Sequence, residues 1–339
     1  MKCSELIAVL EKWFPPQYAC DWDKQIGLQL GSRKQEVNKV LLSLDVTSHE
    51  IDLAIKNNCD LIIAHHALFF NPIQKTNLNN PLGKCLEKLI KHNIGVYIIH
   101  TNMDAAPELG LGVLYAQKLG LDPTKCEVIE VTHTETFYKL AVFVPEKNSE
   151  AVFDALAQAG AGHIGNYSHC SFQTPGTGTF LPGENTKPHI GNKGKLEKVS
   201  EIKIETLVSE SNKNEVIKAM LKAHPYEEVA YDLYPLTHPS KRYGVGLVGT
   251  LDKPKIIAGK KIKRIGLVTG SGGSFVEKAY RLGAEAFYTG EAKYHDQILA
   301  KELGIELICE GHKETEEIFI EPLKRKLKSY FSELSVVSE

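Results

Sequence analysis

The 339-residue sequence lacks two features: closely spaced cysteine pairs, and the excess of basic residues that is typical of general nucleic-acid binders. Its seven cysteines form no CxxC pair, and most lie inside apolar segments, where a reduced thiol packs as a small hydrophobe. Its 40 basic and 42 acidic residues give a formal charge of -2, without the basic excess of a general nucleic-acid binder. Short basic runs such as 260–264 and 324–326 are interpreted as solvated faces. Small molecules are the expected partners.

Long apolar runs are also missing, because none reaches the roughly 18 to 20 residues needed to span a bilayer. The apolar stretch 6–10 is too short, and too soon followed by charge, to be a signal peptide. Together with the reduced cysteines, these absences predict a cytoplasmic protein without a membrane partner.

What is present is typical of a globular protein, with 42% hydrophobic and 24% charged residues. The length exceeds what one hydrophobic core usually supports, so two or three domains are expected. From residue 39 onward, short apolar segments alternate with helical patterns, which predicts a mostly parallel sheet flanked by helices. The expected strands cover residues 40–44, 61–64 and 96–99, and the expected helices cover residues 48–57 and 81–92.

An internal repeat appears when residues 39–66 are laid on residues 264–291 without gaps, at a constant offset of 225 (264 − 39). Val40–Leu44 then falls on Ile265–Thr269, and Leu61–Ile63 falls on Ala286–Tyr288. Glu291 takes the place of His66. Residues 95–99 also resemble residues 304–308. We interpret the chain as two related α/β halves that form one domain.

Between the halves, residues 136–236 follow a different order of elements. Strands are expected over 140–144, 168–173, 203–208 and 230–236, and helices over 149–158 and 212–222. This βαββαβ order predicts a ferredoxin-like module, with the glycine- and proline-rich span 175–194 connecting its two central strands. The predicted fold class is α/β, with a first half over 1–130, an inserted ferredoxin-like domain over 131–240 and a second half over 241–339.

His65 and His66 stand side by side at the end of the predicted strand 61–64. Successive side chains of a strand point to opposite faces, so both rings can serve one site only where the strand ends. Each ring could then bind a different member of a close metal pair. Taken alone, however, the two are better explained as one core histidine and one solvated histidine.

Three further candidates follow other predicted strands. Asp104 follows strand 96–99, and alone it is better explained as the N-cap of a helix that begins near Pro107. His312 and Glu316 follow the apolar residues 307–309 and share one helix face, which alone indicates a solvated surface. Because the carboxyl ends of parallel strands meet at one rim, all five residues together predict a metal site. Imidazole and carboxylate ligands suit zinc, manganese, iron, cobalt or nickel, and Asp104 or Glu316 would bridge two ions.

Two other segments lie beside this predicted rim. Thr269–Phe275 joins a strand to a helix, and a tight turn is favoured there over a cradle of N–H groups for an anion. Glu291 and His295 lie just beyond another predicted strand end, where they could line the same cavity as acid/base groups.

Four segments match motifs of one known family. Trp22–Gln29 resembles its WDN-x-GLQ segment, with Lys24-Gln25 departing from the usual asparagine, and three others resemble its metal motifs: Ala64–Phe70, His100–Asp104 and Gly311–Glu316. The chain thus resembles the Nif-three (NGG-interacting-factor-three-like) family of dinuclear metal proteins over nearly its full length. The resemblance implies that two divalent metal ions are bound by the same five residues: His65, His66, Asp104, His312 and Glu316.

The resemblance also implies an assembly and an activity. The middle segment is similar to the CutA/PII-like insertion of the longer bacterial members, and family members look like toroidal homohexamers. Many bacterial members carry the name GTP cyclohydrolase 1 type 2 homologue, which implies a metal-dependent hydrolase of a nucleotide or related small molecule. For GTP, water would attack C8 of the guanine ring and formate would leave, with His100 or His295 assisting.

A non-catalytic role is the alternative, in which a metal-responsive regulatory or interaction protein senses a ligand through its inserted module. His163, Tyr226 and Glu227 are the residues to test for that role, although ordinary packing and turn formation explain them better.

Overall fold

The computed structural model describes residues 1–338, and of residues 238–240 it describes the backbone only. The chain divides into two compact units: unit 1 is Met1–His133 with Arg242–Glu339, and unit 2 is Thr134–Lys241. Two long strands, β5 (Glu127–Pro145) and β8 (Tyr231–Ile257), each begin in one unit and end in the other. Unit 2 is therefore an insertion into the chain of unit 1.

The first half of unit 1 builds a five-stranded sheet in the order β1-β4-β3-β2-β12. Its strands are β1 (Gly27–Leu30), β2 (Lys39–Ser43), β3 (Leu61–Ala64), β4 (Gly95–Ile98) and β12 (Ser335–Ser338). β2, β3 and β4 pair in parallel, as the sequence predicted, while β1 pairs antiparallel with β4. β12 pairs in parallel with β2, so the end of the chain completes the sheet that its beginning starts.

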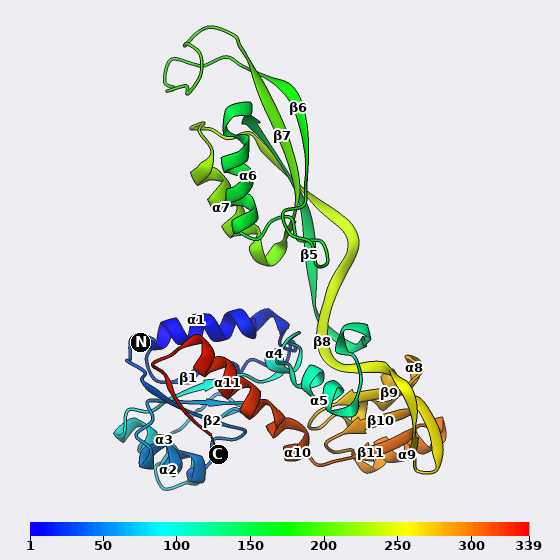
Figure 1. Ribbon diagram of the computed structural model, residues 1–339. Helices are drawn as coiled ribbons and strands as arrows, with labels where there is room; N and C mark the ends of the chain where they lie inside the picture. Colours follow the sequence, from blue (N-terminus) through cyan, green and yellow to red (C-terminus); the bar gives the residue numbers. More distant parts are fainter. Residues whose placement is uncertain (339) are drawn as a thin grey trace. The chain divides into compact units, whose positions relative to one another are not determined.

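Both faces of this sheet are buried, since alternate residues of one strand enter different cores. Val40 and Leu42 enter a core with α1 (Cys3–Trp13) and α11 (Ile320–Tyr330). Leu41 enters a core with α2 (Ser48–Lys56) and α3 (Pro81–Lys91). The two helix pairs cover opposite faces of the sheet (Figure 1). Strands buried on both faces have continuous apolar sequences, which explains why they could be recognised.

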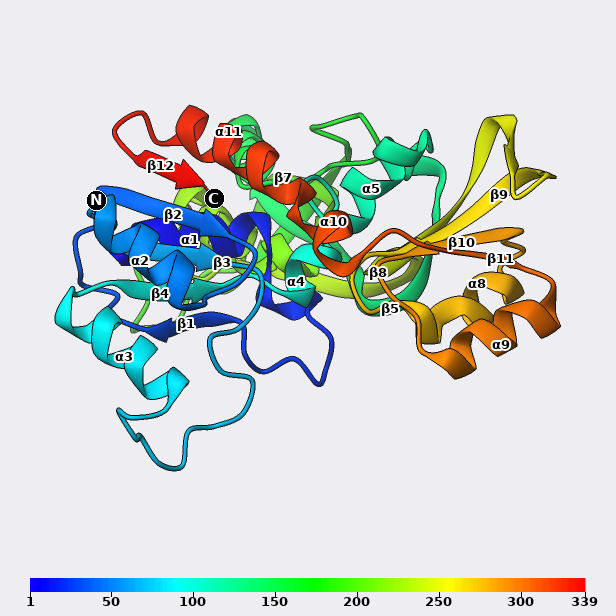
Figure 2. The same cartoon turned by 90° about the horizontal axis from the view of Figure 1, so that it is seen from below.

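The second half of unit 1 contains the parallel strands β9 (Lys260–Val268), β10 (Ala286–Thr289) and β11 (Glu306–Cys309), with β8 antiparallel to β9. One face packs against α5 (Leu111–Leu119). The other packs against α8 (Val276–Arg281) and α9 (Tyr294–Leu303), as Figure 2 shows. The helix α10 (His312–Glu316) follows β11 and leads to α11.

The internal repeat is present in the strand register. Val40 pairs with Leu61 between β2 and β3, and Ile265 pairs with Ala286 between β9 and β10. Both partners are displaced by the same 225 residues (265 − 40 and 286 − 61). The two related α/β halves are therefore confirmed at the level of backbone pairing.

The next strand of the repeat was aligned wrongly by two residues. Gly95 opposes Leu61, and in the second half Glu306 opposes Ala286, so Gly95 corresponds to Glu306 and not to Gly304. Gly304 instead ends α9 with a left-handed φ of 71°. Gly95 is needed for a different reason, because a Cβ there would lie 2.8 Å from Cδ1 of Leu61, so the two glycines produced a false match.

Unit 2 contains α6 (Ser149–Gln158), β6 (Ser171–Phe180), β7 (Glu197–Ser209) and α7 (Lys213–Ala223) between β5 and β8. Across the sheet, its strands are ordered β8-β5-β7-β6. Along the chain, the elements follow the order βαββαβ, which is the order from which the sequence predicted a ferredoxin-like module. α6 and α7 lie side by side against the strands (Figure 1). Their buried side chains form a core with those of β5 and β7, which includes Leu140, Val152, Ile204 and Met220.

The connection between the two central strands of unit 2 is shorter than predicted. Residues 175–180 were assigned to it, but they continue β6 and pair with β7, from Pro175 opposite Ile202 to Phe180 opposite Glu197. β6 is the edge strand, where proline and glycine are tolerated because one row of backbone groups has no strand partner.

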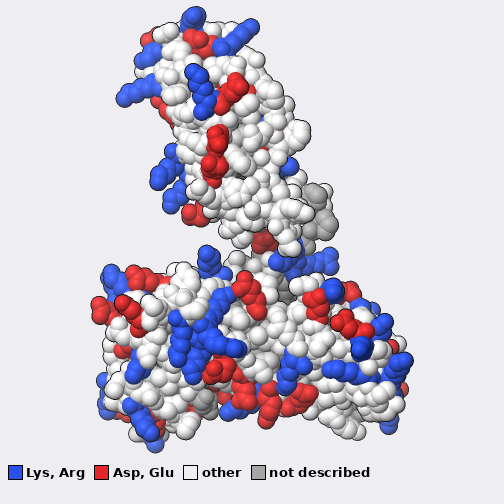
Figure 3. Space-filling model, viewed as in Figure 1, with Lys and Arg blue, Asp and Glu red and all other residues white. Residues whose placement is uncertain are grey.

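The surface of unit 1 mixes charges of both signs. Within the basic runs, Lys324 lies 3.3 Å from Glu321 and Lys260 lies 3.3 Å from Glu306. Figure 3 shows a small group of basic side chains over α11 with acidic side chains near it. All seven cysteines are free. Within residues 1–338, no helix has both the length and the apolar character that crossing a membrane requires.

Short 3-10 helices complete the secondary structure, at Pro16–Tyr18, Pro123–Lys125, Glu146–Asn148, Glu210–Asn212, Gly273–Phe275 and Glu317–Phe319.

Candidate metal centre

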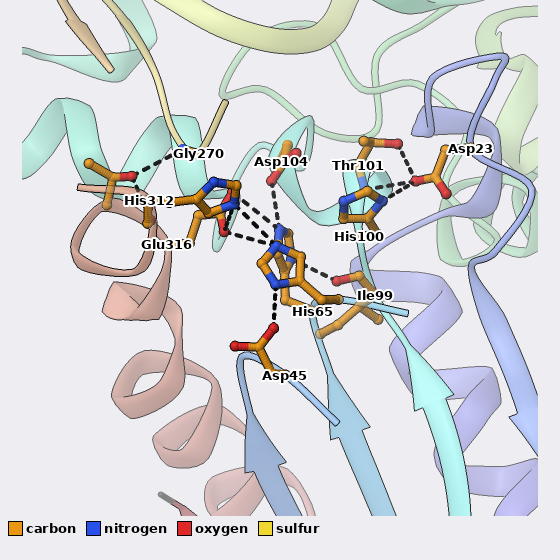
Figure 4. Close-up of polar contacts among 12 residues, drawn as sticks. Asp23, Asp45, His65, Ile99, His100, Thr101, Asp104, Gly270, His312 and Glu316 are labelled. Atoms are coloured by element: carbon orange, nitrogen blue, oxygen red, sulfur yellow. Dashed lines mark hydrogen bonds and ion pairs between the residues drawn. The ribbon is translucent and has the colours of Figure 1, made fainter. Parts of the chain in front are cut away.

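The paired histidines lie immediately beyond the carboxyl end of β3, which ends at Ala64, and Figure 4 shows His65 at this position. The N–H of His65 donates to the carbonyl of Ser43, and that of His66 donates to the carbonyl of Leu44. These bonds hold the two residues against the end of β2, while their ring centroids lie 5.1 Å apart. The expected strand end is present, and it allows neighbouring rings to approach one site.

His65 is completely buried and has a fixed tautomer. Its Nδ1 lies 2.9 Å from the carbonyl oxygen of Ile99, which can only accept, so Nδ1 carries the proton and Nε2 has a free lone pair. That Nε2 lies 3.7 Å from Oδ1 of Asp104 and 3.9 Å from Oε1 of Glu316. Among the described residues, no donor reaches either the His65 Nε2 or the Asp104 Oδ1. A buried lone pair that faces carboxylate oxygens fits a cation placed between them.

The protonation of these two groups supports the same interpretation. Burial lowers the pKa of His65 to about 3, so its ring is neutral and able to act as a ligand. Burial also raises the pKa of Asp104 to about 7, because its carboxylate has lost water and gained no donor. A divalent cation would stabilise the charged carboxylate and bind the neutral imidazole.

The second part of the centre joins the two halves of unit 1 around Glu316. Its Oε2 lies 3.1 Å from Nε2 of His66 and 3.0 Å from Nε2 of His312, and these two nitrogens are 3.4 Å apart. On the far side of each ring, Nδ1 of His66 donates to Asp45 at 2.8 Å, and Nδ1 of His312 donates to Glu291 at 3.1 Å. Both imidazoles therefore direct Nε2 toward the same carboxylate.

This cluster favours positive charge. Burial opposes a charge on His66, but the hydrogen bond to Asp45 and the nearby Glu316 carboxylate outweigh it and raise its pKa to about 9. The contact with Glu316 raises the pKa of His312 to about 9 as well. For Glu316, burial is outweighed by the two imidazoles, which hold its pKa well below the usual range. Protons or a divalent cation can supply the positive charge that this carboxylate stabilises.

Two sets of three side chains offer ligand atoms that all lie within 4.8 Å of one another, and each set could hold a metal ion. One set is His65, His66 and His100, and the other is His66, His312 and Glu316. His66 belongs to both sets. The structure thus brings His100, which the sequence indicated as a catalytic group, to the edge of the centre.

His100 is oriented by a buried carboxylate that the sequence did not single out. Its Nδ1 donates to Asp23 at 2.8 Å, and the same carboxylate oxygen accepts from the backbone N–H and the hydroxyl of Thr101, at 3.1 and 2.6 Å (Figure 4). Burial opposes ionisation of Asp23, but these bonds outweigh it and lower its pKa to about 2. A carboxylate that fixes an imidazole in this way is typical of residues that support metal ligands.

Asp104 does not cap a helix, so that interpretation is wrong. It is the last residue of α4 (Thr101–Asp104), and the next helix, α5, begins at Leu111. The one-turn helix places the Asp104 side chain beside His65, because the chain turns immediately after β4.

The segment Thr269–Phe275 forms the favoured tight turn. The N–H of Gly270 donates to Oγ1 of Thr315, and that of Gly272 donates to Oγ1 of Thr289, so both groups have internal partners. Gly270 has a φ of 61°, and a Cβ built there would lie 1.9 Å from Oε1 of Glu316. The turn therefore needs glycine for its conformation and for the room it leaves to Glu316.

Comparison with known proteins identifies the family. A sequence model of Duf34/NIF3 (NGG1p interacting factor 3) matches residues 1–338. The chain belongs to the Duf34/NIF3 family. Two relatives named GTP cyclohydrolase 1 type 2 homolog are 40% identical over 344 residues (Halalkalibacterium halodurans, 95% of this chain and 91% of the relative) and 39% identical over 346 residues (Bacillus subtilis, 96% and 91%).

A solved structure supports the Duf34/NIF3 fold. The crystal structure of a Bacillus cereus protein related to NIF3 is similar with a TM-score of 0.90 and 37% identity, covering 100% of this chain and 96% of that one. The predicted family and its α/β fold are confirmed.

The predicted site residues fall into two groups in this Duf34/NIF3 protein. His65, His66, Asp104, His312, Glu316 and His100 converge. Within the described chain, neither set of candidate ligands includes Asp104 or His295. Asp104 lies 3.7 Å from Nε2 of His65, whereas His295 is exposed on α9, with its ring centroid 5.8 Å from that of Tyr294. Its proposed role stays a prediction.

Two residues of the centre were missed from the sequence. Asp45 follows β2 at the same rim, so the strand-end argument applied to the histidines would have found it. Asp23 follows no strand of the central sheet, but it lies in the motif Trp22–Gln29, to which no site role was given.

Proposed function

We propose that this protein binds two divalent cations and uses them to hydrolyse a nucleotide or a related small molecule. The proposed ligands are His65, His66, Asp104, His312 and Glu316. The observation that carries the proposal is the buried Nε2 of His65, which faces carboxylate oxygens without a donor.

The positions of the two carboxylates support two ions over one. Nε2 of His65 faces Oδ1 of Asp104 and Oε1 of Glu316, while Nε2 of His66 and Nε2 of His312 face Oε2 of Glu316. A carboxylate with different partners on its two oxygens is suited to bridge a metal pair. Bound divalent cations would polarise a substrate oxygen and lower the pKa of a water molecule. His100, held by Asp23, would then accept or return a proton at its Nε2.

Two exposed aromatic rings beside His100 support a substrate with a planar base. The Trp22 ring is 64% exposed and lies 5.8 Å from the His100 ring, and the Phe70 ring is 47% exposed and lies 6.0 Å from it. The amide of Gln29 donates to the carbonyl of Phe69 and accepts from the N–H of Leu68, so the segments that carry the rings are tied together. Such rings can stack on a purine.

The first experiment measures the metal content of the purified protein after supply of each candidate ion without chelator. We expect two ions per chain in the wild type and a loss of metal in His65→Ala and Glu316→Ala. Glu317→Ala is the matched control, because Glu317 is the exposed neighbour of Glu316. Fewer than one ion per wild-type chain would contradict a dinuclear centre.

The second experiment tests turnover on a nucleotide panel that begins with GTP, the compound in the relatives' names. Formate release would indicate ring opening and phosphate release would indicate ester hydrolysis, and either should disappear in Asp104→Ala. Metal binding without turnover of any panel member would instead favour the metal-responsive regulatory role.

We also propose the homohexameric assembly that the family resemblance implies. Native mass spectrometry of the metal-loaded protein should show six copies of the chain, and a monomer at micromolar concentration would contradict this.

A further inference from the structure

Unit 2 contains a cavity of about 480 Å³ that the proposed function does not use. It lies among β6, β7, the loop that connects them and the residues before β8. Its volume falls in the range of small-molecule sites, about 300 to 1,000 Å³. Its wall combines three aromatic residues with three glutamates: Phe143, Phe180, Tyr226, Glu201, Glu227 and Glu228.

Glu201 is the buried charge of this cavity. Its side chain lies on β7 and the residue is only 9% exposed. Oε1 accepts from the hydroxyl of Tyr226 at 3.0 Å, and a Cβ added to Gly178 would lie 2.1 Å from Oε2, so the carboxylate lies over the glycine backbone. In the described part of the chain, no lysine or arginine forms an ion pair with Glu201. A buried carboxylate without a cation is costly, and a ligand cation would remove that cost.

The nearby His224 does not supply the missing charge. The N–H of Tyr226 donates to its Nδ1 at 3.1 Å, so the ring proton is on Nε2, which donates to the carbonyl of Phe143 at 3.0 Å. Burial lowers the pKa of His224, and the bond to Phe143 only partly opposes this. The ring is therefore a neutral support for Tyr226.

The lining is thus acidic and aromatic. Among the described residues that line the cavity there is no lysine or arginine, and the histidine in the lining, His189, is exposed, with its ring centroid 6.3 Å from that of Tyr226. The rings of Phe180 and Tyr226 lie 5.8 Å apart at 64°, so one presents its face where the other presents its edge. Aromatic faces attract cations, and three carboxylates repel anions such as nucleotides.

We propose that this cavity binds a small organic cation, an ammonium or guanidinium group carried on an apolar or aromatic body. The cationic group pairs with Glu201, and the body packs on Phe180 and Tyr226. Glu227 and Glu228 are exposed and attract the cation toward the cavity.

The test is a binding titration of the full-length protein with 2-phenylethylamine, followed by ligand-observed NMR. 2-Phenylethanol and 3-phenylpropionate are the matched probes, since they keep the ring and replace the charge. We expect the amine to bind in the millimolar range or tighter, the alcohol about tenfold more weakly, and the carboxylate still more weakly. Equal binding of amine and alcohol, or stronger binding of the carboxylate, would overturn the proposal.

Three variants locate the binding. Glu201→Gln keeps the size of the side chain and an acceptor for Tyr226, and should weaken amine binding about tenfold, to the level of the alcohol. Glu228→Gln changes an exposed residue, so its folding is not at risk, and should weaken binding about twofold to threefold. Glu150→Gln, exposed on α6 and outside the lining, should bind as the wild type does. Undiminished binding in both cavity variants, with unchanged circular dichroism, would refute the assignment.

Discussion

The two halves of unit 1 share a strand register but not their chemistry. At the offset of 225, His66 corresponds to Glu291 (291 − 66) and Asp45 corresponds to Gly270 (270 − 45). In the first half, Asp45 orients His66. In the second half, Glu291 orients a histidine from the next strand end, His312, and Gly270 leaves room for Glu316.

This difference between the strand-end residues of the two halves shows which features of the site follow from the duplication. It places two equivalent rims of strand ends in unit 1, since both halves pair their first two strands in the same register. It does not determine which rim position carries a ligand. In the first half, His65 and His66 follow β3 and Asp104 follows β4. In the second half, none of the proposed ligands follows β10, and His312 and Glu316 follow β11. The centre is therefore complete only when both halves contribute.

The largest expected effect on metal content comes from removing the side chains at the equivalent positions 66 and 291, one at a time. His66→Ala should reduce bound metal to about one ion per chain, because its Nε2 lies 3.1 Å from Oε2 of Glu316, on the side that His312 shares. Glu291→Ala should keep the full number of ions but weaken their affinity about 10-fold to 100-fold, because Glu291 only orients His312. Elemental analysis and chelator competition measure the two quantities. Equal loss of metal in both variants would show that Glu291 is itself a ligand.

Smaller effects, on stability and on metal affinity, are expected from substitutions at the equivalent positions 45 and 270. Gly270→Ala places a methyl group against Oε1 of Glu316 at a φ of 61°, which should displace the carboxylate and destabilise the protein by about 1–3 kcal/mol. Asp45→Ala removes only the hydrogen bond to His66 and should weaken metal affinity about tenfold with little loss of stability. Thermal unfolding and chelator competition distinguish the two. If Gly270→Ala keeps wild-type affinity, Glu316 is not confined by the turn.

The same comparison explains what the sequence could predict. Strands such as β3 are buried on both faces, so their apolar runs and the histidines at their ends could be recognised directly. Convergence of His312 with His66 depends on packing between the halves. The strand-end argument predicted it only from the five residues together, and the family resemblance implied the same five. Asp23 reaches His100 across 77 residues from a segment without strand character, where periodicity carries no information. Residues 175–180 of β6 contain proline and glycine, whose turn preference concealed an edge strand.

The carboxylates that support the imidazoles should differ in their pH dependence. Asp23 is buried and its pKa is lowered from 3.8 to about 2, so it contributes about 2 kcal/mol above pH 4 that is lost as the pH falls toward 2. In metal-free protein, the difference in unfolding free energy between wild type and Asp23→Asn should therefore shrink as the pH falls from 6 to 3. Glu291, which is exposed, should show little such dependence in Glu291→Gln. Denaturant titrations at several pH values measure this. A constant difference for Asp23→Asn would show that its charge is not stabilised by His100 and Thr101.

The smallest expected effect is a change in nucleotide affinity when an exposed aromatic residue of either half is replaced. Trp22 lies beside His100 in the first half, whereas Tyr294, 71% exposed, lies beside His295 in the second. If the first half alone receives the planar base, Trp22→Ala should weaken nucleotide binding about tenfold without loss of metal, because one stacking contact is worth about 1–3 kcal/mol. Tyr294→Ala and His295→Ala should change neither quantity. Quenching of Trp22 fluorescence by the nucleotide measures binding in Tyr294→Ala, and calorimetry measures it in Trp22→Ala. Weaker binding in Tyr294→Ala alone would indicate that the substrate binds beside the second half. The role of proton acceptor and donor would then be assigned to His295 and no longer to His100.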